Sequence, residues 1–434
     1  MADDHDLSAL RDALAAKGVT RVRVIHPDPH GRARSKDYPL ASLPDLKGGI
    51  GYCEASLVEG LDGEPLMEGP HAGAKGLPDT HAVPDATSAR QVPWDPATAW
   101  LLADIVDPGH VPSGLCCRAV LRGEIERLAA HGLRAVTASE PEFYLLGPGS
   151  GPGVERYAAG IGLAYTSGWR GDPDGVLREM HDACAAMGLG VTAAHHEVSP
   201  GQFEMNIAHG EVLDATDRIF LFEEVVKEIA GRRGLSANFM AKPFADMEGS
   251  SHHIHLSLWN ADGNAFAEPG GGLSELGRSF AAGLIAHAPA LTALASPTIN
   301  SYKRLANANI GLAPLVADMA GDDRSAYLRV PPQGGAATRV ELRIGDASAN
   351  PYLLTAAALA AGRDGIERGL VPGDPVALPT DLGAALAALA ADPVVAGALG
   401  PKMVRTHVDV KRRELDRFAR AVTDWEWTEY ADHV

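Results

Sequence analysis

Charged and imidazole side chains recur at every second position in segments that otherwise have the composition of β-strands. Because side chains on a strand point alternately to opposite faces, residues two apart share a face. The segments with this spacing are Glu140 and Glu142 in SEPEFYLL, His253, His255 and Ser257 in SHHIHLSL, and Arg339, Glu341 and Arg343 in TRVELRIG. One such strand would fit a solvent-exposed edge. Several together favour a sheet that lines a cleft with its polar face and packs helices against the other.

A further group of acids flanks a turn in HHEVSPGQFEMN, residues 195–206. Glu197 and Glu204 stand on either side of a Pro-Gly turn, next to His195 and His196. Clustered carboxylates repel each other unless cations neutralise them. Glutamate and histidine suit Mg²⁺ or Mn²⁺, and the interleaved arginines suit phosphate oxygens. Metals and arginines without a nucleophile motif indicate phosphoryl transfer, and the chain has no G-x-x-x-x-G-K-[ST] loop.

Composition narrows the class of protein. The chain has 434 residues and a formal net charge of −18, which argues against nucleic-acid or anionic-membrane partners. Its four cysteines show no C-x-x-C spacing, so neither a zinc site nor a disulfide framework is indicated. The N-terminus lacks an apolar signal core, and no apolar run approaches the roughly 18 residues of a membrane span. We expect a soluble, cytoplasmic protein.

The pattern along the chain predicts an α+β protein of two domains. Residues 7–17 read as a helix, 19–27 as a strand, and the following PDPHGRARSKDYPL as a turn or hairpin. Residues 37–98 are rich in glycine and proline with short apolar runs, whereas strand-like runs alternate with long helices from about residue 105. We therefore place a small N-terminal β domain at 1–104 and a large α+β domain at 105–434.

An ordered set of motifs resembles the glutamine synthetase family of the bacterial, ring-forming type (type I). The motifs are SEPEF, HHEVSPGQFE, GSSHHIHLSL, NSYKRL, DRSAYLRVP, RVELRIGD and ANPYLLTAAALAAGRDGI, all in family order. The resemblance implies a β-grasp-like N-terminal domain and a catalytic domain whose curved antiparallel sheet forms a half-barrel backed by helices. It also implies a homo-oligomer of two stacked hexameric rings, a dodecamer in which one subunit's small domain closes its neighbour's site.

The resemblance also implies roles for individual residues. Two to three Mg²⁺ or Mn²⁺ ions per site would be held by Glu142, Glu197 and Glu204 on one side and by Glu140, His253 and Glu341 on the other. ATP, the co-substrate, would contact His195, His255, Ser257, Arg329 and Arg339. Glutamate would contact Gly249, Arg304 and Arg343, and Arg324 and Glu341 would be catalytic. In the family, glutamate's γ-carboxylate attacks the γ-phosphorus of ATP, and an amine captures the γ-glutamyl phosphate. The Pro-Gly turn would bring Glu197 and Glu204 onto one ion.

The chain departs from the family pattern at the ammonia site. The flap after the YKRL arginine is RLANANIGLAP, residues 304–314, and it contains no acid. Cys53 stands where an N-terminal aspartate of the neighbouring subunit is usual, or Glu54 does if the alignment slips by one. An ammonium ion needs anionic partners, so we expect a larger amine, with Cys53, Glu54, Ile310 and Leu312 as candidates for its site. Ile310 and Leu312 favour an uncharged or partly apolar amine, although Glu54, Glu59 and Asp62 leave a polyamine open.

The sequence thus predicts an ATP-dependent glutamate–amine ligase, most similar to members that make γ-glutamylamides or γ-glutamylpolyamines. The alternatives are a true glutamine synthetase and a catalytically silent, ring-forming paralogue.

Glu248 replaces a usual asparagine beside the predicted position of glutamate's amino group. GLVPGDPVALPTDLG lacks the regulatory tyrosine, which predicts no control by adenylylation. We expect Trp425 and Trp427 to anchor the C-terminal segment in the core or at an interface.

Overall fold

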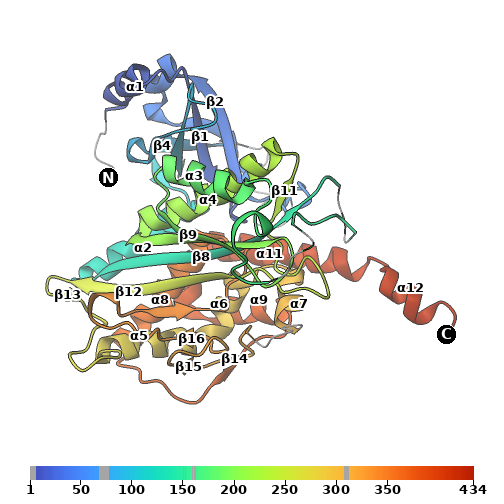
Figure 1. Cartoon of the computed structure of the whole chain (residues 1–434). Coiled ribbons are helices and arrows are strands. Elements are labelled where there is room, and N and C mark those ends of the chain that lie inside the picture. Colours follow the sequence, from blue (N-terminus) through green and yellow to red (C-terminus); the bar gives the residue numbers. More distant parts are fainter. Residues whose placement is uncertain are drawn as a thin grey trace.

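The N-terminal part of the chain folds around a mixed sheet. The computed structural model describes residues 6–67, 78–149, 151, 153–158, 160, 163–306 and 312–434. The first sheet contains β1 (Arg21–Pro27), β2 (Ala33–Pro39), β3 (Ile50–Cys53), β4 (Asp79–Pro84), β5 (Arg90–Gln91), β6 (Thr98–Asp107) and β7 (Val111–Pro112). Its main order is β2-β1-β6-β4-β3, and β1 and β6 are parallel. Helix α1 (Leu7–Ala16) precedes it, and the sheet lies at the top of Figure 1.

The expected hairpin after the first strand is confirmed, since β1 and β2 pair antiparallel from Arg21↔Pro39 to Pro27↔Ala33. Strand β6 runs across residue 104 and β7 pairs with its end, so the first sheet continues to Pro112. The division of the chain into domains stays a prediction.

A nine-stranded sheet forms the centre of the larger part. Its strands are β8 (Arg134–Leu146), β9 (Val191–His196), β10 (Gln202–Glu211), β11 (Ser236–Asn238), β12 (His252–Asn260), β13 (Gly263–Asn264), β15 (Met319–Ala320), β16 (Leu328–Arg329) and β17 (Val340–Leu342). The main order is β15-β16-β17-β12-β8-β10-β9. All pairs are antiparallel except β15 with β16. The sheet curls into a half-barrel backed by helices, as expected. A separate pair joins β14 (Val316–Ala317) to β18 (Val376–Ala377).

The two faces of this sheet differ in chemistry, as the two-residue spacing predicts. On the apolar face, side chains from β8, β10, β12 and β17 join the hydrophobic core: Phe143, Leu145, Phe203, Met205, Ile254, Leu256, Val340 and Leu342. Glutamates and histidines of the same four strands occupy the opposite face. Burying an aliphatic or aromatic side chain contributes about 1.5–3 kcal/mol. The apolar face therefore stabilises a sheet whose other face carries charge.

The helices come from segments with a 3.6-residue apolar period. They are α2 (Cys117–Ala130), α3 (Val176–Ala186), α4 (Val212–Arg232), α5 (Glu275–Ala286), α6 (Ala288–Ala295), α7 (Ile299–Ala306), α8 (Pro351–Glu367), α9 (Leu382–Ala391), α10 (Pro393–Leu399), α11 (Pro401–Ala419) and α12 (Asp424–Tyr430). α2 and α4 contact β8, α3 contacts α4 and β9, and α5 packs along α8. Figure 1 shows α3 and α4 between the first sheet and strands β8 and β9 of the larger one.

A buried arginine connects the two parts of the chain. The Arg118 guanidinium on α2 is almost fully buried and pairs with Asp217 on α4 at 2.8 Å and with Asp104 on β6 at 2.7 Å. It also pairs with Asp85 at 2.9 Å. Burial opposes ionisation of Asp85, but Arg118 lowers its pKa to about 2. Removing one partner of such a buried network typically costs about 3–5 kcal/mol, because it strands the remaining charges.

Helix α12 projects from the body of the molecule at the C-terminus (Figure 1). None of its residues is buried, and Trp425 and Trp427 are 62% and 67% exposed. These two tryptophans therefore do not anchor the C-terminus in the core of their own chain, and that expectation is wrong. Their placement at an interface stays a prediction.

Within the described part of the chain, no single helix is long and apolar enough to cross a membrane. Only α9 and α10 together reach that composition, and they are bent by 86°.

The structure revises the sequence-based elements in two places. The two runs LRAVTAS and EFYLLG form one continuous strand, β8, which pairs through Pro141 with His252 of β12. SELGRSFAAGLIAHAPALTAL, whose composition would suit one long helix, divides into α5 and α6 at His287. The division follows from Pro289, which has no backbone N–H to continue the first helix.

Helices α5 and α8 approach each other through glycines, which gives a testable prediction. A Cβ on Gly283 would lie 2.1 Å from the Ala361 carbonyl oxygen and 2.9 Å from the Gly365 Cα. Because both contacts are backbone atoms, Gly283→Ala must push the helices apart, and we expect a loss of about 1–3 kcal/mol or more. The matched control is Gly231→Ala on α4, where nothing lies within 4 Å. That change should be neutral or stabilising by up to about 1 kcal/mol. Thermal unfolding measures both, and equal melting temperatures would contradict the close packing.

Candidate active site

The polar face of the large sheet opens into a cavity of about 430 Å³. Its lining contains all six predicted metal ligands, four of the five predicted arginines, and His195 and Gly249: Glu140, Glu142, Glu197, Glu204, His253, Glu341, Arg304, Arg324, Arg329, Arg343, His195 and Gly249. These residues come from six strands, a helix and the connecting loops. Charges that lie up to about two hundred positions apart in the sequence thus meet in one place, as the alternation pattern predicts.

Strand register explains the convergence. Glu142 of β8 is the pairing partner of Glu204 of β10, and Glu140 is the partner of His253 on β12. Residues directly opposite each other on neighbouring strands have Cβ atoms about 4.5–5.5 Å apart. Across the next interface His255 is opposite Glu341, which itself is opposite Arg329. A slip of one residue in any pairing would move a whole set of charges into the core.

One group of possible metal ligands lies around the hairpin between β9 and β10. His195, Glu197 and Glu204 each offer one ligand atom, and these atoms lie within 4.8 Å of one another. His195 Nε2 is 3.0 Å from Glu197 Oε1 and 3.8 Å from Glu204 Oε1. The turn therefore brings Glu197 back beside Glu204. His195, expected on the nucleotide side, is the imidazole nearest to this pair, and its role stays a prediction.

A second group lies at the centre of the sheet. Glu140, His255 and Glu341 place one ligand atom each within 4.8 Å of one another. His255 Nε2 is 3.0 Å from Glu140 Oε1, whereas His253 Nδ1 is 3.8 Å from Glu140 Oε2 and 3.6 Å from Glu341 Oε1. Both histidines therefore face the same two carboxylates, and their shared face is as predicted. The choice of His253 as ligand and His255 as nucleotide contact stays a prediction.

The carboxylates differ in how they are compensated. Burial, reinforced by repulsion from Glu142 and Glu140, raises the pKa of Glu204 to about 9. Burial and then Glu197 raise the pKa of Glu142 to about 7. Burial also opposes ionisation of Glu140, but hydrogen bonding with His253 and His255 holds its pKa below the usual range. Hydrogen bonding with imidazoles thus favours the ionised form of Glu140, whereas burial and repulsion among carboxylates disfavour the ionised forms of Glu142 and Glu204.

Glu142 is held by hydrogen bonds on the cavity floor. Its carboxylate accepts from the Ser251 backbone N–H at 2.9 Å, from the Ser251 hydroxyl and from Gln202 Nε2 at 3.0 Å. Gln202 also donates to the Gly249 carbonyl at 3.0 Å. These contacts fix the carboxylate where β8, β10 and the segment before β12 meet.

The arginines of the cavity differ in their hydrogen-bond acceptors. Arg329 donates to Glu341 at 2.7 Å, and Arg343 also donates to Glu341. Arg304, on α7, is 6% exposed, and its guanidinium donates to the carbonyls of Ile344 at 3.2 Å and Arg343 at 3.5 Å. Burial lowers the pKa of Arg304. A buried guanidinium whose hydrogen-bond acceptors are neutral carbonyls is suited to receive an anionic ligand.

Most of the remaining predicted residues lie outside the lining of this cavity. Arg339 donates to His255 Nδ1 at 3.2 Å, and Ser257 accepts from Trp259 Nε1 at 3.1 Å, so both lie farther along the polar face. Cys53 ends β3 in the N-terminal sheet, and Glu54 pairs with Lys402 at 2.6 Å. Leu312 lines the cavity, whereas Ile310 lies outside the described residues.

Several lining residues were missed in the sequence. Gln202 and Asn206 share the spacing of Glu204 on β10, so the two-residue period could have identified them. Tyr165 gave no such signal, because it lies in the long connection between β8 and α3. Its ring stands 5.0 Å from that of His195. Ala164, Val198 and Ala313 complete an apolar wall on this side.

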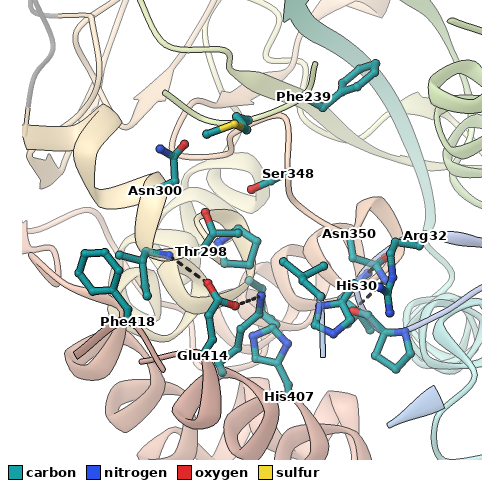
Figure 2. A pocket seen from close by; sticks show the side chains of 18 of the residues that line it. His30, Arg32, Phe239, Thr298, Asn300, Ser348, Asn350, His407, Glu414 and Phe418 are labelled. Atoms are coloured by element: carbon teal, nitrogen blue, oxygen red, sulfur yellow. Dashed lines mark hydrogen bonds and ion pairs between the residues drawn. The ribbon is translucent and has the colours of Figure 1, made fainter. Parts of the chain in front are cut away.

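A second, larger cavity of about 680 Å³ lies between the β1–β2 turn and helices α7 and α11 (Figure 2). Its acids are isolated from each other, and Glu414 pairs with Lys411 at 3.0 Å. Figure 2 shows His407, Glu414 and Phe418 on α11 and Asn300 on the opposite side. Helix α7 separates the cavities, with Asn300 in this one and Arg304 in the other. The cluster of carboxylates and arginines therefore distinguishes the smaller cavity as the candidate for chemistry.

Comparisons with known proteins agree with this geometry. Residues 114–430 match the family model described as glutamine synthetase, catalytic domain. The chain belongs to the glutamine synthetase family. It is 33% identical to a glutamine synthetase from Rhizobium leguminosarum bv. phaseoli, over 94% of this chain and 96% of that protein. It is also 33% identical to a glutamine synthetase from Halobacterium salinarum, over 98% and 96%. A solved complex of GmaS with ADP superimposes with a TM-score of 0.86 at 33% identity, covering 100% of both chains.

Membership of this family makes the chain an ATP-dependent ligase. Enzymes of the family use ATP and divalent ions such as Mg²⁺ or Mn²⁺, and they bind glutamate together with ammonia or amines and form oligomers. The residues present fit such ions, because each of the two ligand groups offers carboxylate oxygen and imidazole nitrogen. The raised pKa of Glu204 is consistent with an unmet need for positive charge beside it. Bound ions would supply that charge and neutralise phosphate oxygens.

The two ligand groups predict that divalent ions bind independently of turnover. Glu204→Gln and Glu341→Gln should each remove one Mn²⁺ from the binding isotherm or weaken it at least about tenfold, since each removes an anionic ligand. The control is His196→Ala. His196 Nδ1 bonds to the Glu197 carbonyl and its ring packs on Phe203, so it lies outside both groups. Titration calorimetry and Mn²⁺ electron paramagnetic resonance measure the stoichiometry. Unchanged Mn²⁺ binding in both glutamine variants would contradict the assignment.

Proposed function

We propose that this enzyme joins glutamate to an organic amine at the expense of ATP, forming a γ-glutamylamide through γ-glutamyl phosphate. The observation that carries the proposal is the composition of the cavity wall beside Glu197. Tyr165 and Val198 lie on this side, and Ala164 and Leu312 add apolar lining to the same cavity, whereas an ammonium ion would need carboxylates. The carbon body of an amine would gain from burial against such a wall.

The acid substrate is assigned to the Arg304 side of the cavity. Arg304 is the buried guanidinium whose acceptors are carbonyls, and it lies against Gly249. A Cβ at position 249 would stand 2.8 Å from Arg304 Cγ and 2.5 Å from the Ala241 carbonyl oxygen. Glycine is therefore required for the arginine to lie this close to the backbone. The arrangement supports bidentate binding of a carboxylate at a fixed depth.

The chain's other residues have distinct tasks in the proposed reaction. Arg324 and Arg329 line the same cavity and would receive the transferred phosphoryl oxygens, which lowers the cost of the developing charge. Glutamate's γ-carboxylate oxygen forms a bond to the γ-phosphorus as the bond to ADP breaks. The amine's lone pair then forms the C–N bond as the C–O bond to phosphate breaks, and the proton that the nitrogen loses leaves with the phosphate. Tyr165, Val198 and Leu312 would exclude water, which otherwise hydrolyses the acyl phosphate.

A neighbouring subunit is part of the proposal. Cys53 and Glu54 lie on the N-terminal sheet and outside the lining of their own chain's cavity. In two stacked hexameric rings, a neighbour's residues of this segment would face the amine. The identity of the acceptor amine would therefore depend both on the apolar wall of the cavity and on residues of the adjoining subunit.

An amine panel tests the proposal directly. With ATP, Mg²⁺ and L-glutamate, we expect at least one primary organic amine to give a higher kcat/KM than ammonium. Phosphate release measures the rate, and mass spectrometry of the product identifies the γ-glutamylamide. Ammonium outperforming every organic amine would overturn the proposal in favour of a true glutamine synthetase. Absence of turnover with any amine, despite bound nucleotide, would favour a silent paralogue.

The apolar wall also predicts a change of specificity. Leu312→Glu places a carboxylate in the cavity, so we expect kcat/KM for ammonium relative to the best organic amine to rise on the order of tenfold. The matched control is Leu315→Glu, three residues further along the chain. Leu315 is 69% exposed and lies outside the cavity lining. If both variants keep the wild-type preference, Leu312 does not help to select the amine.

A further inference from the structure

We propose that Ser251 limits Glu142 to a single available carboxylate oxygen, and that the metal site beside the β9–β10 hairpin therefore favours Mg²⁺ or Mn²⁺ over Ca²⁺. The inference rests on the predicted role of Glu142 as a metal ligand and is independent of which acid and which amine the enzyme joins. Glu142 is the register partner of Glu204, which belongs to the ligand group around the hairpin. The hydrogen bonds of Glu142 therefore influence what this group can bind.

Ser251 and Glu142 are joined by three hydrogen bonds. The Glu142 backbone N–H donates to the Ser251 carbonyl at 2.9 Å, and the Ser251 backbone N–H donates to Glu142 Oε2 at 2.9 Å. The Ser251 hydroxyl donates to Glu142 Oε1. On its other side, Ser251 forms a β-bridge with Asp346. The serine is therefore held between two extended segments, and both it and Glu142 are buried.

These donors occupy most of the acceptor capacity of the Glu142 carboxylate. An ionised carboxylate has about four lone-pair positions, two on each oxygen. Oε2 accepts from the Ser251 N–H and from Gln202 Nε2 at 3.0 Å, so both of its positions are taken. Oε1 accepts from the Ser251 hydroxyl, which leaves one position among the described contacts. The carboxylate can therefore offer one oxygen to an ion and cannot chelate the ion with both.

The donor from Gln202 is fixed as firmly as those from Ser251. The Gln202 side-chain amide also donates to the Gly249 carbonyl at 3.0 Å, and its oxygen accepts from the Tyr144 hydroxyl at 3.4 Å. Gln202 is 1% exposed, so its amide cannot turn away to solvent. Rotation of Gln202 would break all of these bonds in a buried place, which is costly. Oε2 of Glu142 thus stays occupied when an ion binds.

Divalent ions differ in how they use a carboxylate. Ca²⁺ takes about six to eight oxygen ligands in a flexible geometry and can bind both oxygens of one carboxylate. Mg²⁺ requires nearly ideal octahedral geometry, which single oxygens from separate ligands satisfy, and Mn²⁺ also suits octahedral oxygen sites. A glutamate that offers one oxygen withholds a ligand that Ca²⁺ would gain. It withholds nothing that Mg²⁺ or Mn²⁺ needs.

The test is metal competition on the full-length enzyme without nucleotide, acid or amine. Electron paramagnetic resonance follows bound Mn²⁺ while Ca²⁺ or Mg²⁺ is added, and the binding class that Glu204→Gln removes marks the hairpin site. In Ser251→Ala, Glu142 Oε1 loses its donor, so we expect the affinity for Ca²⁺ relative to Mn²⁺ to rise on the order of tenfold. The affinity for Mg²⁺ relative to Mn²⁺ should be unchanged. Ser251→Thr, which keeps the hydroxyl, should retain the wild-type preference.

Ser250→Ala is the matched control, because the Ser250 hydroxyl is buried and has no hydrogen-bond partner among the described residues. It should leave the affinities for all three ions unchanged. An unchanged ratio of Ca²⁺ to Mn²⁺ affinity in Ser251→Ala, even with weaker binding of every ion, would overturn the proposal in favour of a purely structural role. Circular dichroism checks folding, and Ser251→Cys, whose thiol is a weak donor, replaces the alanine variant if that variant is unfolded. Since no substrate is present, failure of the organic-amine proposal leaves this comparison intact.

Discussion

Repulsion among carboxylates on one face of the large sheet is the constraint on which the rest of this structure depends. Register places Glu142 opposite Glu204, and burial with mutual repulsion raises their pKa values to about 7 and about 9. Such a face is unfavourable for folding unless other interactions offset it. The offset comes from the opposite face, where apolar side chains of the same strands pack against helices, and from donors such as Ser251 that hold individual carboxylates. The fold therefore maintains a site that attracts cations.

The parts that the sequence predicts well are those governed by strand alternation. Glu140, His253 and Glu341 each belong to a set of charged residues spaced two apart on its own strand. They were therefore expected on the polar face of the sheet, and they line one cavity. Alternation cannot predict contacts made by loops or choices between near neighbours. Tyr165 reaches the cavity through a long connection, and Pro141 lies inside a continuous strand although proline usually interrupts one. Spacing alone also cannot distinguish His253 from His255, because both lie on the same face of β12. In the structure, the two rings lie at different distances from the Glu140 carboxylate.

The end of the cavity that is proposed to bind the acid is shaped by backbone packing rather than by charge alone. Arg304 lies against Gly249, where any Cβ would meet both its side chain and the Ala241 carbonyl. Its guanidinium is positioned by the carbonyls of Arg343 and Ile344, which directly follow β17. The arginine therefore has little freedom to follow a differently shaped ligand. A site built in this way selects length and charge placement in the acid, because a shift of the arginine would break its hydrogen bonds.

The end of the cavity that is proposed to receive the amine is built on different principles. Carboxylates and histidines of the central cluster lie on paired strands, where one substitution disturbs the register of its neighbours. Tyr165 and Leu312 lie in connections between elements, which tolerate substitution because few backbone hydrogen bonds depend on them. The phosphoryl-transfer machinery is therefore constrained by the sheet, while the acceptor wall is free to change. Specificity for the amine can evolve by exchange of loop side chains, leaving the electrostatics of the sheet intact.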